Sequence, residues 1–169
     1  RDLILETIQR AMVHNTSAKA ALDIAVHDLF GQRYGMPLYR FFGGRRQRIA
    51  SDLTISVNPP DVMAADAVKA VQAGYHHVKL KVGIDSTVDF ERVAAIRKAV
   101  GNDIAIRLDA NQGWKPKEAI RLIRAMEDAN LAIELIEQPV RAADFEGLKQ
   151  VTDHVDTPIM ADESAFSPT

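Results

Sequence analysis

The sequence contains no cysteine, which excludes disulfide bonds and thiolate metal ligands from this chain. It also lacks any apolar stretch of about 18 residues, the length that a membrane-spanning helix needs. Neither sign of charge dominates, because 21 basic and 23 acidic residues leave a net charge of -2. A broad electrostatic surface for nucleic acid or an anionic membrane is therefore not expected. Together these absences favour a cytoplasmic protein that binds neither nucleic acid nor a membrane.

The amino-terminal segment, RDLILETIQR, lacks the long apolar core of a signal peptide and does not begin with methionine. We therefore expect the chain to start partway into a longer protein. With 47% hydrophobic and 26% charged residues, the composition is that of a globular protein with a sizeable core.

The first part of the sequence predicts helices followed by a linker. Apolar residues recur at three- and four-residue steps over about residues 15–30, which indicates an amphipathic helix. Gly31 and Gly35 are expected to end that helix, and the short segment PLYRFF follows. Paired glycines and three arginines then indicate a boundary loop, so we expect one domain over 1–47 and another over 48–169.

From residue 48 onward, strand patterns alternate with helix patterns. Strands are expected at SDLTISV, HHVKLKV, IAIRLDA, AIELIEQ and PIMADE, with helices between them. Strands joined by helical crossovers form a parallel sheet, either doubly wound or closed into a (β/α) barrel. A barrel has eight such units and needs on the order of 200 residues. We therefore expect an α/β fold that is part of a barrel of about five units.

Two lysines and three carboxylates stand at the ends of four of these strands. They are Lys79 and Lys81 in VKLKVG, Asp109 in RLDANQGW, Glu137 in LIEQP and Asp162 in PIMADES. Successive steps from Lys81 to Asp109, Glu137 and Asp162 are 28, 28 and 25 residues, which suits one strand, one helix and two short loops. Because the carboxyl ends of parallel strands meet at one rim, we expect all five side chains to gather there.

Strand alternation places most of these side chains on one face of the sheet. Both lysines and both aspartates alternate with apolar residues that point the other way. Glu137 does not fit this pattern, because simple alternation groups it with Ile133 and Leu135. A bulge at the strand end, or an apolar lower layer in the barrel, would each reconcile its position.

This combination of residue types suits carbon-acid chemistry. Three carboxylates form an oxygen-only site of the kind that Mg²⁺ or Mn²⁺ prefers. A divalent ion stabilises the charge that develops on a substrate carboxylate when its α-proton is removed to give an enolate. A lysine can take that proton only when neutral, and a second ammonium nearby lowers its pKa. Taken singly, each feature is also ordinary for a solvated strand face or a helix cap.

With these motifs in view, the chain resembles the enolase superfamily, in its muconate-lactonizing subgroup, and most of all the dipeptide epimerases that act on L-Ala-D/L-Glu. The matching segments are AKAALDIAVHDLFGQRYGMPLYRFFGG, TISVN, VKLKVG, RLDANQGW, IEQPV and PIMADES, which span nearly the whole chain. The resemblance implies that residues 1–47 are the last helices of an α+β capping domain with a linker. Residues 48–169 would be the first part of the catalytic barrel.

The resemblance also implies an isomerase that uses Mg²⁺ to epimerise a small carboxylate substrate, a dipeptide. It implies these roles: Asp109, Glu137 and Asp162 as metal ligands, Lys81 as the base, Lys79 as the neighbouring ammonium that helps the base lose its proton, and Thr54 near the substrate. The roles of two other residues are left open. Trp114 either roofs the site or packs in the core, and Glu163 is a candidate to support the metal ligands.

Two rival interpretations share much of this pattern. A family epimerase carries a second lysine on the sixth strand and acidic residues on the eighth, which we expect outside this chain. A cycloisomerase or an o-succinylbenzoate synthase would use much the same residues. The second rival is an inactive fragment, whose exposed barrel edges would drive association into a homo-oligomer.

Overall fold

The computed structural model describes residues 1–45 and 48–165 of the 169-residue chain. Its contacts divide the chain into two compact units, Arg1–Ile49 and Ala50–Thr169. Two residues of the predicted linker, Arg46 and Gln47, lie outside the described residues. No helix in the described part of the chain combines the length and the hydropathy that crossing a membrane requires.

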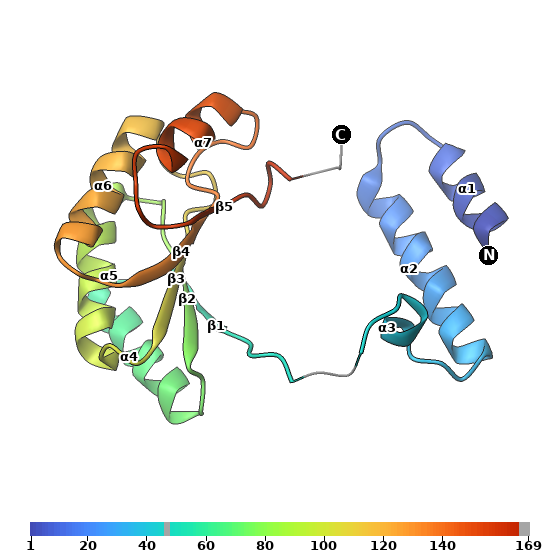
Figure 1. Cartoon of the computed structure of the whole chain (residues 1–169), viewed down its shortest axis with the longest axis horizontal. Coiled ribbons are helices and arrows are strands. Elements are labelled where there is room, and N and C mark those ends of the chain that lie inside the picture. The colour runs from blue at the N-terminus through green and yellow to red at the C-terminus, as the bar shows by residue number, and fades with distance from the viewer. Residues whose placement is uncertain (46–47, 166–169) are drawn as a thin grey trace. The chain divides into compact units, whose positions relative to one another are not determined.

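The first unit is helical and comprises α1 (Asp2–Arg10), α2 (Thr16–Arg33) and α3 (Leu38–Phe41) (Figure 1). α1 was not predicted; it has no side-chain cap and buries no residue. The expectation that Gly31 ends the second helix is wrong, because α2 continues to Arg33. A Cβ on Gly31 would lie 3.1 Å from the carbonyl oxygen of Met36, so the glycine allows the chain to return closely against the helix.

The second unit alternates strands and helices. The strands are β1 (Leu53–Ile55), β2 (His77–Lys81), β3 (Ala105–Asp109), β4 (Ile133–Glu137) and β5 (Ile159–Met160). The helices are α4 (Pro60–Gln72), α5 (Ser86–Val100), α6 (Pro116–Asp128) and α7 (Phe145–Thr152). All neighbouring strands are parallel, and their order is β1-β2-β3-β4-β5.

The strand order decides between the two predicted sheet architectures. In a doubly wound sheet the order reverses at a switch point and helices cover both faces. Here every strand lies beside its neighbour in sequence, so right-handed crossovers place α4, α5, α6 and α7 on the same face (Figure 1). This arrangement is a wall of a (β/α) barrel, and the predicted partial-barrel fold is confirmed.

The helix-covered face of the sheet forms the hydrophobic core. Val78 and Leu80 of β2, and Ile106 and Leu108 of β3, are fully buried. They belong to one cluster with helix residues that include Met63, Ala67, Val93, Ile96, Ile123 and Met126. Burying one such side chain contributes about 1.5–3 kcal/mol relative to leaving it exposed. The residues that alternate with these core positions are consequently turned to the opposite face.

A change of register in β4 explains the position of Glu137. The pairing of β3 with β4 shifts between Ile106 and Arg107, where β4 contains one extra residue. Such a bulge moves every following residue to the other face of the sheet. Glu137 therefore pairs with Asp109 and shares its face. The bulge accounts for Glu137, and it lies near the start of the strand rather than at its end.

At the amino ends of the strands, a buried arginine links several loops through hydrogen bonds. Arg97 of α5 is 6% exposed. It donates hydrogen bonds of 2.6–2.9 Å to the carbonyl oxygens of Gly101, Ile104, Leu131 and Ala132. Burial lowers the pKa of this guanidinium from its ordinary value. The side chain thus ties the end of α5 to the start of β3 and to the turn between α6 and β4.

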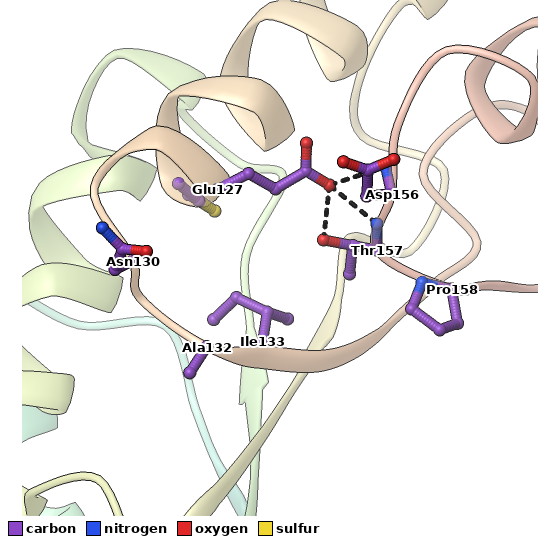
Figure 2. A pocket seen from close by; sticks show the side chains of 8 residues that line it. Glu127, Asn130, Ala132, Ile133, Asp156, Thr157 and Pro158 are labelled. Carbon is purple, nitrogen blue, oxygen red and sulfur yellow. Dashed lines mark hydrogen bonds between the residues drawn. The ribbon is translucent and has the colours of Figure 1, made fainter.

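Glu127 of α6 forms a second group of hydrogen bonds between segments at the same end of the strands. One of its carboxylate oxygens accepts hydrogen bonds of 2.7–2.9 Å from the backbone N–H groups of Asp156 and Thr157 and from the Thr157 hydroxyl (Figure 2). These residues line a pocket of about 340 Å³. Active sites of (β/α) barrels occupy the carboxyl ends of the strands, so this pocket lies at the end associated with stability.

Replacing Arg97 with methionine should lower the free energy of unfolding by about 2–4 kcal/mol, because four carbonyl groups lose their donor. Urea-induced unfolding measures the change. Lys98→Met is the matched control, since Lys98 is the exposed neighbour on the same helix, and its effect should stay within about 0.5 kcal/mol. Equal losses of unfolding free energy in both variants would show that the hydrogen bonds of Arg97 do not stabilise the fold.

Candidate active site

Four of the five predicted charged residues meet on the face of the sheet opposite the helices. Lys79 Nζ lies 2.9 Å from Asp109 Oδ2 and 2.7 Å from Glu137 Oε2. Lys81 Nζ lies 2.7 Å from the same Asp109 oxygen. The contacts follow from strand register, because Asp109 pairs with Lys81 on one side and with Glu137 on the other. Three adjacent strands thereby form one network of two ammonium groups and two carboxylates.

Burial and neighbouring charges act against each other in this network. Burial would raise the pKa of Asp109, but hydrogen bonds from Lys81 and Lys79 hold it below its ordinary value. Burial would lower the pKa of Lys79, yet hydrogen bonds to Glu137 and Asp109 raise it. For Glu137, burial and two nearby carboxylates raise the pKa despite the hydrogen bond from Lys79. Negative charge is therefore held most firmly on Asp109, which is 1% exposed.

Asn111 also joins the network, a role that was not predicted for it. Its side-chain oxygen accepts a hydrogen bond from Lys81 at 2.6 Å, and its backbone N–H donates to Asp109 Oδ1 at 3.0 Å. Its Nδ2 lies 3.5 Å from Glu163 Oε1. The other Glu163 oxygen is buried and has no hydrogen-bond partner among the described residues. Strand alternation, which groups Asn111 with Asp109, was the signal that could have identified it.

Gln138 holds the loop that carries Asp162. It is fully buried, and its Oε1 accepts hydrogen bonds from the backbone N–H groups of Asp162 and Ser164 at 2.9 and 3.0 Å. Its Nε2 donates to the Val140 carbonyl oxygen at 2.9 Å and to the Ser164 hydroxyl at 2.8 Å. The Asp162 side chain is exposed. The structure thus places Asp162 at the same rim, although its carboxylate takes no part in the lysine contacts within the described residues.

The residue types of this rim suit a hard divalent cation, although their positions do not yet form a complete set of ligands in the described residues. Within residues 1–45 and 48–165, no three His, Asp or Glu side chains lie close enough together to share one ion. The chemistry of the set is nevertheless suitable, since carboxylate oxygens are the ligands that Mg²⁺ prefers. The rim has four carboxylates, on Asp109, Glu137, Asp162 and Glu163, against two ammonium groups. Together with the unpartnered Glu163 oxygen, this excess leaves negative charge that a cation would neutralise.

The remaining predicted positions lie on either side of the sheet. Thr54 pairs with Lys79 from the neighbouring strand and is exposed, so it shares the charged face. A pocket of about 450 Å³, lined in part by Ser56, Lys81 and Ile84, opens at the carboxyl ends of β1, β2 and β3. Trp114 is 3% exposed and belongs to the core cluster. Of the two roles considered for Trp114, packing in the core is the one that the structure shows.

Parallel βα units, a single layer of helices and a charged rim at the strand carboxyl ends define a protein of the (β/α)-barrel class. Residues 62–169 match the family described as Enolase C-terminal domain-like. Residues 2–43 match the family described as Mandelate racemase / muconate lactonizing enzyme, N-terminal domain. The chain therefore belongs to the enolase superfamily, which confirms the resemblance drawn from its motifs.

Individual relatives have narrower functions. The chain is 54% identical to L-Ala-D/L-Glu epimerase from Clostridium acetobutylicum, over 99% of this chain and 47% of that protein. It matches the substrate-liganded complex of L-Ala-D/L-Glu epimerase from Bacillus subtilis with a TM-score of 0.94 and 52% identity, over 99% of this chain and 47% of that one. Dipeptide epimerase from Enterococcus faecalis, complexed with Mg and L-Leu-L-Tyr, matches with a TM-score of 0.81 and 51% identity, over 86% and 41% of the two chains. The chain spans about half the length of the curated relatives it matches.

Replacing Gln138 with leucine should cost about 2–4 kcal/mol in the free energy of unfolding, because the N–H groups of Asp162 and Ser164 lose their acceptor. Gln112→Leu is the control. Gln112 lies on the neighbouring loop of the same rim, and its Oε1 accepts one hydrogen bond, from the Ala142 N–H at 2.9 Å. Thermal or urea unfolding should show a loss of about 1 kcal/mol for this control. Similar losses in both variants would argue against a special role for Gln138.

Proposed function

We propose that this chain carries the metal-binding and proton-abstracting part of a Mg²⁺-dependent dipeptide epimerase that acts on L-Ala-D/L-Glu substrates. The contact of Lys81 Nζ with Asp109 Oδ2 at 2.7 Å supports the proposal most directly, because it sets a candidate base beside a candidate metal ligand. Similarity to the epimerases from Clostridium acetobutylicum and Bacillus subtilis supports the choice of reaction.

Asp109, Glu137 and Asp162 would hold the Mg²⁺ ion in this proposal. All three offer carboxylate oxygens, and the excess negative charge of the rim favours a divalent cation. When bound, Mg²⁺ would act as a Lewis acid that stabilises the charge developing on the substrate carboxylate. Mn²⁺ prefers the same type of ligand and is expected to substitute for it. The Enterococcus faecalis relative, whose complex contains Mg and a dipeptide, supports this assignment.

Lys81 would remove the α-proton. The lone pair of its neutral Nζ forms the new N–H bond, and the electrons of the broken C–H bond move into the carbon–carbon bond of the enolate. Lys79 is less suited to this role. Burial would lower the pKa of Lys79, but hydrogen bonds to the two carboxylates raise it, so this lysine keeps its proton. It remains a fixed positive charge that neutralises Asp109 and Glu137.

Epimerisation also requires a proton to reach the opposite face of the enolate. Lys79 and Lys81 are two residues apart on β2 and point to the same side of the sheet. They therefore approach a bound substrate from one direction, and the second proton must come from a different group. Because the two proton transfers need different groups, exchange of the α-proton and inversion of the α-carbon can be measured separately.

The substrate would be a small carboxylate, in this proposal a dipeptide. Its α-carbon must come within reach of Lys81 Nζ, and Lys81 lines the pocket of about 450 Å³. Thr54 lies on the same face at the register position of Lys79. Its hydroxyl can donate one hydrogen bond and accept up to two, which suits contact with a peptide or carboxylate group of the substrate.

Lys81→Ala in the complete enzyme should lower kcat for L-Ala-L-Glu epimerisation by about 10²–10⁴-fold, the usual contribution of a general base. Exchange of the α-proton in deuterated water, followed by NMR, should fall with it. Lys98→Ala, at an exposed position of α5, should retain full activity. An unimpaired Lys81→Ala enzyme would refute the base assignment. Wild-type enzyme without turnover or exchange would refute the epimerase, and turnover of another carboxylate would then indicate a cycloisomerase or a synthase.

Asp109→Asn should weaken Mg²⁺ binding at least about tenfold, because it removes a charged ligand. Isothermal titration calorimetry with MgCl₂ measures the affinity directly, and a chelator should abolish activity until Mg²⁺ is restored. Asp128→Asn, at an exposed position of α6, is the control and should bind Mg²⁺ like the wild type. Unaltered affinity in Asp109→Asn would remove Asp109 from the metal site.

A further inference from the structure

Asp89 of α5 is a fully buried carboxylate that the proposed reaction does not use. Its Oδ2 accepts hydrogen bonds from the Gly83 backbone N–H at 2.9 Å and from the Trp114 indole Nε1 at 3.0 Å. Its Oδ1 accepts a hydrogen bond from Arg92 at 2.8 Å. Both oxygens are therefore satisfied, and a single oxygen atom joins two separate loops.

These two loops leave the strands that carry the site. Gly83 follows Lys81 by two residues, between β2 and α5, and Trp114 lies in the loop between Asp109 and α6. The strands also remain paired at this point, because the Val82 N–H donates to the Asp109 carbonyl oxygen at 2.9 Å. Asp89 consequently braces the backbone just beyond the candidate base and the candidate metal ligand.

Close backbone packing couples the braced loops. A Cβ on Gly83 would lie 2.2 Å from the Ala110 carbonyl oxygen, and a Cβ on Gly113 would lie 2.1 Å from the Gly83 carbonyl oxygen. Gly83 also has a φ of 88°, a conformation that other residues rarely adopt. The loops have no space to move toward each other. A displacement of Gly83 would therefore be passed to Ala110 and so to the adjacent Asp109.

We infer that Asp89 is a positioning residue for the reaction: by holding Gly83 and Trp114 on one oxygen, it sets the spacing between Lys81 Nζ and the Asp109 carboxylate. The reaction named in this inference comes from the proposed function. The contacts on which the inference is based do not depend on that function. A misplacement of about 1 Å in an active site can cost about 10²-fold in rate. Loosening these loops should accordingly affect kcat more than KM.

Two variants test the hydrogen bonds of Asp89 in different ways. Asp89→Asn keeps the shape of the side chain but offers one acceptor oxygen. Whichever way its amide is turned, an NH₂ group faces either Arg92 or the two loop donors, so donors oppose each other. Trp114→Phe keeps an aromatic ring in the core and removes the N–H that binds Asp89. Each variant should lower kcat about tenfold or more and change KM less than about twofold.

Glu127→Leu, which removes the acceptor altogether, is the control for a general loss of stability. Glu127 also joins two segments through three hydrogen bonds to one carboxylate oxygen, but at the amino ends of the strands. Assayed well below its unfolding midpoint, this variant should keep kcat within about twofold of the wild type. Hydrogen exchange over residues 79–84 and 110–115 provides a readout that does not depend on the reaction. It should accelerate in Asp89→Asn and Trp114→Phe and remain unchanged in Glu127→Leu.

A tenfold loss of kcat together with faster loop exchange in both variants, and neither effect in the control, would support the inference. Unchanged kcat in both variants of an active enzyme would overturn it, as would unchanged loop exchange. A wild-type enzyme that neither epimerises L-Ala-L-Glu nor exchanges its α-proton would count against the proposed function instead. Mg²⁺ affinity then decides the positioning role: a loss of about threefold or more in both variants supports it, and unchanged affinity overturns it.

Discussion

The ammonium group of Lys79, held between two carboxylates on neighbouring strands, is the contact on which the charged face of the sheet depends. Asp109 and Glu137 are paired in register and both are buried. Two like charges so close together, and so poorly hydrated, would destabilise the pair of strands that carries them. Lys79 reaches both carboxylates at 2.7–2.9 Å. Its charge makes a face rich in carboxylates compatible with a folded sheet.

That face is possible because stability and chemistry occupy different parts of the second unit. The helix-covered face is apolar, and the amino ends of the strands are fastened by Arg97 and Glu127 through hydrogen bonds to backbone and hydroxyl groups. The carboxyl ends instead carry excess negative charge, which opposes folding. Interactions at one end of each strand thus offset the electrostatic cost at the other. Such a division is the general arrangement of (β/α) barrels.

Much of the second unit could be predicted from local pattern. Alternating periods of two and 3.6 residues marked its strands and helices, and near-equal spacing brought the lysines, Asp109 and Glu137 to one rim. The face of Glu137 could not be deduced, because a bulge has no signature in simple alternation and depends on pairing with β3. Gly31 was misjudged for a similar reason. Its role is to let the chain after α2 approach closely, and that approach is a tertiary contact.

The supporting residues were harder to find than the charged ones. Asp89 and Gln138 act through backbone N–H groups and the Trp114 indole, which lie 6 to 26 residues away in sequence. Asp89 occupies an early position of α5 where an acidic residue is also expected for helix stability. Its second role is therefore hidden by an ordinary one. Only the fold shows that this carboxylate faces the loops of the site rather than solvent.

The backbone at the rim shows why these side chains matter. Asn111, Gln112 and Gln138 have φ values of 42°, 68° and 38°, in the left-handed region. Such conformations cost residues other than glycine on the order of 1–3 kcal/mol each. Glycine would avoid that cost, but it could not supply the side-chain hydrogen bonds that these three residues make to Lys81, the Ala142 N–H and the loop of Asp162. The rim therefore retains strained polar residues because their side chains hold its loops in place.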